Sequence, residues 1–125
     1  MNCKENNIAA IILTNTTNGN RDNLKSELKK QEGGLSGEPL QQISTNMIKK
    51  FYKHLGSKIP IIGVGGVNSG KSAYEKIIAG ASLLQLYTSF IYRGPLTAKY
   101  IKKELIQILK AEGIKNIKDI IGKDI

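Results

Sequence analysis

The sequence contains no tryptophan, one cysteine and three prolines, and it lacks any apolar run of the roughly 20 residues that a membrane-spanning helix requires. The longest uninterrupted apolar run near its start covers residues 8–13, which is the length of a strand. The single cysteine, Cys3, cannot form a disulfide within the chain, which is typical of a reducing compartment. A basic and apolar leader with a small-residue cleavage site is also absent, so we expect no secretion signal.

The length of 125 residues suits one compact domain, residues 1–125, and leaves no room for a second one. The formal net charge is +9, but Arg21 and Arg93 are the only arginines among the 19 basic residues. The lysines are spread along helix-like segments of a chain also rich in Ile and Asn, which indicates a compositional bias and solvated helix faces. We therefore expect no nucleic-acid partner.

Three short apolar runs predict strands, at residues 8–13, 59–64 and 83–87. Each run is almost continuous rather than alternating, and this is typical of parallel strands that helices cover on both faces. A polar, glycine-rich stretch from Thr16 to Glu38 follows the first run. This connection is far longer than usual, and loops of that length tend to carry function.

Amphipathic helical patterns lie between and after these runs. Their apolar positions are Leu40, Ile43, Met47, Ile48, Phe51 and Leu55, then Ala73, Ile77 and Ile78, then Ala98, Ile101, Leu105, Ile108 and Leu109, and last Ile117, Ile120 and Ile121. Gly56, Gly80, Gly113 and Gly122 follow the patterns, where a left-handed residue commonly ends a helix. The order predicts a parallel α/β sheet with right-handed crossovers. Because three strands leave two edges and much apolar surface unpaired, we expect association with a larger assembly or another copy.

The stretch from Gly65 to Ser72 matches the Walker A pattern, so a small P-loop nucleotide-binding protein is one hypothesis. A P-loop enzyme also needs a carboxylate at the end of a neighbouring strand to hold magnesium. Neither of the other two apolar runs ends in one. Ordinary helix-start chemistry explains the same residues, with Asn68 or Ser69 as the cap and Lys71 on the solvent side.

A different phosphate site uses more of the residues. Gly63, Gly65 and Gly66 follow one predicted strand and permit close approach of the backbone to an anion, while Tyr87, Thr88 and Ser89 follow the next strand and begin a helix. In (β/α)8 barrels a phosphate often lies between two such consecutive loops. Two ordinary strand-to-helix turns remain the alternative interpretation.

Four segments carry a resemblance to a known family: "LTNTT" (13–17), "GGLSGEPL" (33–40), "IPIIGVGGVNSGKSAYEKIIAGASLLQLYTSF" (59–90) and "GP" (94–95). Together they resemble the quinone-dependent (class 2) dihydroorotate dehydrogenases. The resemblance covers nearly the whole chain but only the carboxyl-terminal part of the family's fold. It implies the last three β/α units of a TIM (β/α)8 barrel, an α/β fold present here as a partial barrel of parallel strands. It also implies the family's activity, which is the oxidation of dihydroorotate to orotate in pyrimidine biosynthesis. These flavoenzymes use flavin mononucleotide (FMN) as cofactor and quinone as electron acceptor.

The resemblance also implies roles for individual residues. Asn15 and Thr16 are similar to the family's substrate-binding pair, and an Asn amide can both donate to a carboxylate and accept from a ring N–H. The positions that resemble FMN contacts are Thr14, Gly37, Gly65, Gly66, Tyr87 and Thr88, of which the last four form a phosphate clamp. No metal ligand is implied.

The family's catalytic serine base and its quinone-binding, membrane-contacting lid belong to sequence upstream of the region represented here. We therefore assign no catalytic residue within the 125 residues and expect the chain alone to be inactive. Ser36 and Ser89 are interpreted as capping residues and His54 as a surface residue. Full-length relatives are expected at the cytoplasmic side of the inner membrane, and this chain is expected to be soluble and cytoplasmic. A non-catalytic half-barrel that self-associates or pairs with an amino-terminal half is the remaining hypothesis.

Overall fold

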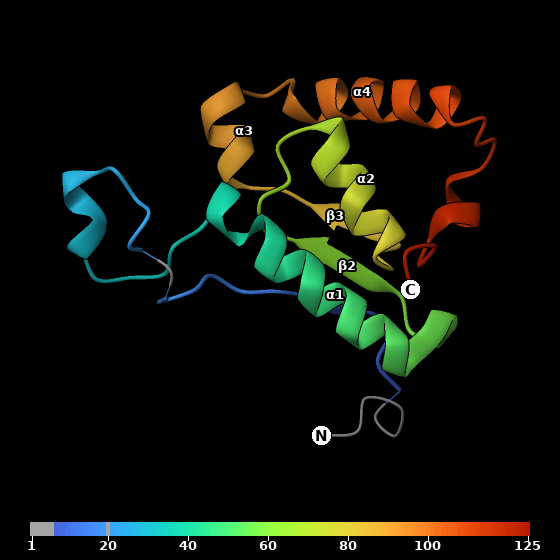
Figure 1. Cartoon of the computed structure of the whole chain (residues 1–125), viewed down its shortest axis with the longest axis horizontal. Helices are drawn as coiled ribbons and strands as arrows, with labels where there is room; N and C mark the ends of the chain where they lie inside the picture. Colours follow the sequence, from blue (N-terminus) through green and yellow to red (C-terminus); the bar gives the residue numbers. More distant parts are fainter. Residues whose placement is uncertain (1–6, 20) are drawn as a thin grey trace.

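The computed structural model describes residues 7–19 and 21–125, so Cys3 lies outside the described residues. Three parallel strands form one sheet with β2 at its centre: β1 (Ile11–Leu13), β2 (Ile61–Val64) and β3 (Leu83–Gln85). The three predicted strands are confirmed, although each is shorter than its apolar run. Figure 1 shows how the helices lie beside the sheet.

The helices follow the predicted order. They are α1 (Gln41–Leu55), α2 (Gly70–Ile78), α3 (Thr88–Arg93) and α4 (Thr97–Ala111), with short 3₁₀ helices at η1 (Glu27–Lys30), η2 (Glu38–Leu40), η3 (Gly56–Lys58) and η4 (Ile117–Ile120). Gly56, Gly80, Gly113 and Gly122 all have positive φ, as predicted for the residues that end the helical segments. Within the described part of the chain, none of these helices has both the length and the apolar character that crossing a bilayer requires.

Only one face of the sheet is covered. The register places Leu13 beside Gly63 and Gly63 beside Leu84, and this face packs against the helices through Ile48, Ile61, Ala79 and Ala81. The opposite face carries Ile12 and Leu83, which are 56% and 61% exposed. The prediction of helices on both faces is therefore wrong. A continuous apolar run is expected for a strand between two helical layers, but also for a strand of a barrel, whose second face points into the barrel.

A second core lies between α2 and α4. It contains Val67, Ala73, Ile77, Ile101, Leu105 and Ile120. The two helices approach closely at Gly70, where an added Cβ would lie 2.5 Å from the Glu104 Cβ. Figure 1 shows α4 running above α2, and the C-terminal segment returns to the end of α2, where Gly122 donates to the Ile77 carbonyl at 3.1 Å.

Three positions of the predicted apolar faces are exposed, and they are Ile43, Ala98 and Ile117. Ile43 is 40% exposed, and Ser44 takes the buried position beside it because its hydroxyl donates to the Val64 carbonyl. Ala98 is exposed because the face of α4 that packs on α2 follows the four-residue steps Thr97, Ile101 and Leu105. The apolar pattern of each helix allowed more than one buried face, and packing against specific partners decided which face is buried.

The long connection folds back on itself as a small lobe at the end of the molecule where α3 begins (Figure 1). Thr17 and Leu35 exchange two backbone hydrogen bonds of 3.1 and 2.7 Å. The Arg21 guanidinium donates to the carbonyl oxygens of Lys29, Gln31 and Gly33. One arginine thus holds the far side of the lobe, and the segment around Gly33 returns to the ends of the strands.

Candidate functional site

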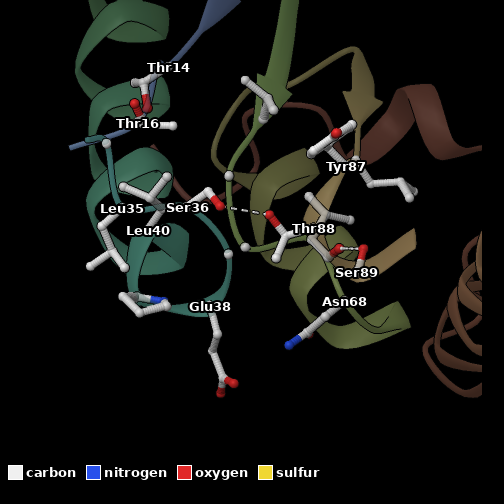
Figure 2. Close-up of a pocket in the computed structure, with 18 of the residues that line it drawn as sticks. Thr14, Thr16, Leu35, Ser36, Glu38, Leu40, Asn68, Tyr87, Thr88 and Ser89 are labelled. Atoms are coloured by element: carbon white, nitrogen blue, oxygen red, sulfur yellow. Dashed lines mark hydrogen bonds between the residues drawn. The ribbon is translucent and has the colours of Figure 1, made fainter. Parts of the chain in front are cut away.

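A cavity of about 760 Å³ lies at the carboxyl ends of the three strands. The loops that follow parallel strands meet at this edge of a sheet, which is where α/β proteins bind ligands. All eight predicted site residues line it: Thr14, Asn15, Thr16, Gly37, Gly65, Gly66, Tyr87 and Thr88. Figure 2 shows Thr14 and Thr16 on one side of the cavity, with Tyr87 and Thr88 on the other. The fold therefore brings together four segments that are separated by up to about 70 residues.

The segment after β1 supplies polar side chains. The Asn15 Oδ1 atom accepts a hydrogen bond of 2.8 Å from the Thr16 amide, and both residues are exposed to the cavity. The Thr16 hydroxyl donates to the same oxygen at 3.5 Å, so these bonds orient the Asn15 side chain and leave its NH₂ group for a ligand. The Thr16 hydroxyl lies so close to Gly34 that any side chain at position 34 would collide with it. Sequence reasoning missed Gly34, whose glycine requirement arises from this contact.

The returning lobe is fastened to the start of α3. The Thr88 hydroxyl donates to the Ser36 hydroxyl at 3.0 Å, which Figure 2 marks with a dashed line. Gly37 has φ of 84°, and a Cβ there would lie 3.0 Å from the Thr88 Cγ2. The lobe therefore closes one side of the cavity through contacts with the segment after β3.

Ser36 and Ser89 are not capping residues, so this prediction is wrong. Ser36 receives the bond from Thr88, while the buried Ser89 hydroxyl donates to the Val67 carbonyl at 2.6 Å. The N-cap of α3 is Tyr87, which makes no side-chain cap bond. Both serines instead join the segment after β3 to its neighbours. His54 is exposed at the end of α1, as predicted.

Gly65 and Gly66 have φ values of 106° and 72°, a conformation that side chains other than glycine rarely adopt. A Cβ at Gly66 would lie 2.5 Å from the Gln41 Cβ and 2.7 Å from its backbone nitrogen, and one at Gly65 would lie 3.2 Å from the Ser44 Cβ. The first turn of α1 thus fills the space beside both glycines. The sequence-based reason for these glycines was access for an anion, whereas the structure adds a packing requirement that acts without any ligand.

Several amide groups at the cavity are free to bind an anion. Among the residues that the structure describes, the N–H groups of Gly66, Thr88 and Ser89 have no hydrogen-bond acceptor. These groups come from the segments after β2 and β3, and all three residues line the same cavity. Backbone amides of this kind, with glycines that let the chain approach, are the usual donors for a phosphate group.

The Walker A residues form hydrogen bonds within the protein. The Gly70 amide donates to the Glu104 carboxylate at 2.6 Å, so a side chain of α4 already occupies the N-terminus of α2. This hydrogen bond is the main cause of the lowered pKa of Glu104. Ser69 and Ser72 form a capping box, so Ser69 rather than Asn68 is the cap among the two predicted candidates, and Lys71 is exposed. The structure therefore leaves no phosphate site at this turn.

Asn68 and Arg93 are two further cavity residues that sequence reasoning missed. The Arg93 guanidinium donates to the Asn68 carbonyl and lies 3.3 Å from the Glu104 carboxylate. This contact fixes an arginine at the rim of the cavity, where its charge favours an anionic ligand although Glu104 offsets part of it. No sequence signal marked Arg93, because its partners lie 11 and 25 residues away along the chain.

Comparison with known proteins gives one consistent result. The family model described as dihydroorotate dehydrogenase matches residues 1–109. The chain is 46% identical over 121 residues to mouse mitochondrial dihydroorotate dehydrogenase (quinone), covering 97% of this chain and 31% of the mouse protein. It is 47% identical over 115 residues to the Arabidopsis thaliana mitochondrial enzyme of the same name, covering 91% of this chain and 25% of that protein.

The fold is also similar to solved structures. A ligand-free dihydroorotate dehydrogenase from Eimeria tenella superposes with a TM-score of 0.92 at 45% identity, covering 97% of this chain and 33% of that one. The chain thus spans about a third of the length of the relatives it matches. The predicted α/β class, parallel strands of a partial TIM barrel, is confirmed.

Proposed function

Because the chain belongs to the dihydroorotate dehydrogenase family, we propose that it serves the oxidation of dihydroorotate to orotate, with a quinone as final electron acceptor. The observation that carries the proposal is the single cavity lined by all eight residues that the family resemblance selected. Its volume of about 760 Å³ is within the range of small-molecule and cofactor sites. This reaction belongs to pyrimidine biosynthesis.

We propose FMN as the cofactor of this cavity. Gly65, Gly66, Tyr87 and Thr88 would hold its phosphate, supported by the free amides of Gly66, Thr88 and Ser89 and by the rim arginine Arg93. Thr14 and Gly37 would contact the rest of the flavin. When bound, the flavin supplies a hydride acceptor for the oxidation of the substrate.

Asn15 and Thr16 are the proposed substrate contacts. Both are exposed to the cavity, and the NH₂ group of Asn15 is held by the bond between its Oδ1 atom and the Thr16 amide. A fixed amide donor beside a threonine hydroxyl suits the carboxylate of dihydroorotate or orotate, because both groups donate to carboxylate oxygens. These residues would bind and orient the substrate rather than move its proton.

We assign the proton-abstracting base to sequence outside these 125 residues, because the family resemblance implies a serine base there. The open sheet face at Ile12 and Leu83 supports a partner that completes the barrel, which would be an amino-terminal portion or a second copy. The isolated chain is then a domain-sized part, residues 1–125, that is inactive by itself. Contact with quinone and with a membrane would be made by the same outside sequence.

The test is flavin binding together with turnover. Titration of the purified chain into FMN, followed by flavin fluorescence, should give saturable binding that is tighter than for riboflavin, which lacks the phosphate. Dihydroorotate and a dye acceptor should give no turnover with the isolated chain. Equal binding of the two flavins would contradict the proposed phosphate clamp, and turnover would contradict the external base.

A further inference from the structure

Lys76 is the one charged residue of α2 whose side chain is fully enclosed, with 0% exposure. Its ammonium donates to the Gln41 carbonyl at 3.3 Å, the Ser44 hydroxyl at 3.1 Å and the Thr45 hydroxyl at 3.0 Å. All three acceptors belong to the first turns of α1. The three donors of the ammonium are therefore used, and each acceptor is neutral.

The charge of Lys76 is not balanced by a direct ion pair. The ion pairs among the described residues join Lys49 to Asp124 and Arg93 to Glu104. The neighbouring carboxylate, Glu75, accepts instead from the Gln41 side chain at 2.7 Å. Burial lowers the pKa of Lys76 to about 8, with Glu75 opposing the shift, so the ammonium is mostly protonated at pH 7. Burying a charge without a counter-charge is costly, which singles out this position.

Two links connect Lys76 to the cavity wall. Its acceptor Ser44 donates in turn to the carbonyl of Val64, and Val64 lines the cavity. Its acceptor Gln41 provides the backbone that lies against Gly66. The ammonium therefore lies behind the Gly65–Gly66 turn, separated from it by one layer of α1.

We propose that Lys76 is a positioning residue for an anion at this turn: it holds the first turn of α1 against Gly65 and Gly66, and its buried charge favours the phosphate of FMN. The inference rests on the proposed flavin site and adds to it a residue that does not contact the ligand. The charge of Lys76 is buried and acts through protein rather than through water, so we expect its loss to weaken phosphate binding by roughly tenfold. The charge of an exposed lysine would be screened by solvent and salt.

The experiment compares FMN with riboflavin, which differs from it only by the phosphate, in the 125-residue chain. Lys76→Met removes the charge and its three bonds while keeping an unbranched apolar chain. Lys71→Met, five residues earlier on the same helix and exposed, is the matched control. We expect Lys76→Met to weaken FMN by about tenfold and to leave riboflavin within about twofold, while the control changes neither.

The outcomes separate this inference from the flavin site itself. A wild-type chain that does not prefer FMN over riboflavin contradicts the proposed phosphate clamp, and the role of Lys76 with it. If wild type prefers FMN and Lys76→Met keeps the same preference, only the role of Lys76 is overturned. An equal loss of affinity for both flavins in Lys76→Met also overturns it, because that result indicates a structural role alone.

Ser44→Ala provides a second variant that keeps the charge and two of its acceptors. It breaks the link between Lys76 and Val64, so the preference for FMN should fall by about threefold, less than in Lys76→Met. If Lys76→Met does not fold, an unchanged preference in Ser44→Ala overturns the inference. Thermal unfolding without flavin, measured for each variant, shows which of them are folded.

Discussion

The carboxylate of Glu104 accepts a hydrogen bond of 2.6 Å from the amide of Gly70, so one turn of α4 caps the N-terminus of α2. The close approach of the two helices depends on the missing side chain of Gly70, because a Cβ there would collide with Glu104. The same carboxylate holds Arg93 at the rim of the cavity. Glu104 thus joins the α2–α4 core to the candidate site through Gly70 and Arg93, and its carboxylate occupies the helix N-terminus that a Walker A loop would use for phosphate.

Glu104→Ala should lower the free energy of unfolding by about 1 kcal/mol at pH 7, the usual effect of losing a helix cap. The pKa of Glu104 is lowered in the folded state, so its contribution is present above the unfolded pKa and is lost as the pH falls through the folded value. The difference between wild type and variant should therefore shrink from pH 7 to pH 3. Urea denaturation at both pH values measures it. Gln107→Ala, at an exposed position of α4, is the control, and an equal effect of the two substitutions would refute the cap.

Lys71→Ala should leave every ligand-binding property unchanged, because Lys71 is exposed and the N-terminus of α2 is already capped. Isothermal titration of wild type with ATP or GTP and magnesium should show no binding. Flavin binding by Lys71→Ala should match that of wild type. Magnesium-dependent nucleotide binding that disappears in the variant would restore the P-loop hypothesis.

Gly66→Ala should destabilise the chain by about 2–4 kcal/mol, since strain at positive φ adds to a collision with the backbone of Gln41. Gly33→Ala is the matched control. Gly33 also has positive φ, but a Cβ there has nothing within 4 Å, so only the conformational strain of about 1 kcal/mol remains. Thermal unfolding compares the two variants. Similar losses would mean that packing against α1 is not what requires glycine at position 66.

Wild type should gain stability as the pH rises from about 8 to 10.5, relative to Lys76→Met. The folded pKa of Lys76 is lowered to about 8 from 10.5, so in this window the unfolded chain binds more protons than the folded one, and raising the pH favours folding. The relative gain should be about 3 kcal/mol. Denaturation of both proteins at pH 7.5, 9 and 10.5 measures this gain. The neighbouring carboxylate Glu75 opposes the lowering of the Lys76 pKa. Parallel pH profiles for the two proteins would show that Lys76 does not titrate in this range.

The open sheet face should drive association. Replacing both Ile12 and Leu83 by Thr puts β-branched side chains at both strand positions and removes apolar surface that is more than half exposed, so the fold should lose little stability. Sedimentation velocity should show wild type as an oligomer, or as a complex when a barrel-completing partner is present, and should shift the double variant toward monomer. A monodisperse wild-type monomer that binds no partner would contradict this prediction.

Local patterns in the sequence determined the three parallel strands, the order of the helices and the glycines that end them, because strand length, helical periodicity and turn chemistry depend on neighbouring residues. The resemblance selected the cavity segments around Thr14, Gly37, Gly65 and Tyr87, and the strand order brought them to one edge. That edge was predictable because parallel strands all present the same end of their chains.

Only the tertiary structure decided which face of the sheet is covered, which residue of α1 turns inward at Ser44, and what surrounds Lys76 and Gly70. The partners of Lys76 lie 31 to 35 residues away in the sequence, and Glu104 lies 34 residues from Gly70. A lysine on an amphipathic helix normally extends to solvent, and the sequence near position 76 contains nothing that would bury it. Hydrogen bonds and close contacts between distant segments form only when the helices pack. They therefore produce no pattern among neighbouring residues from which they could be predicted.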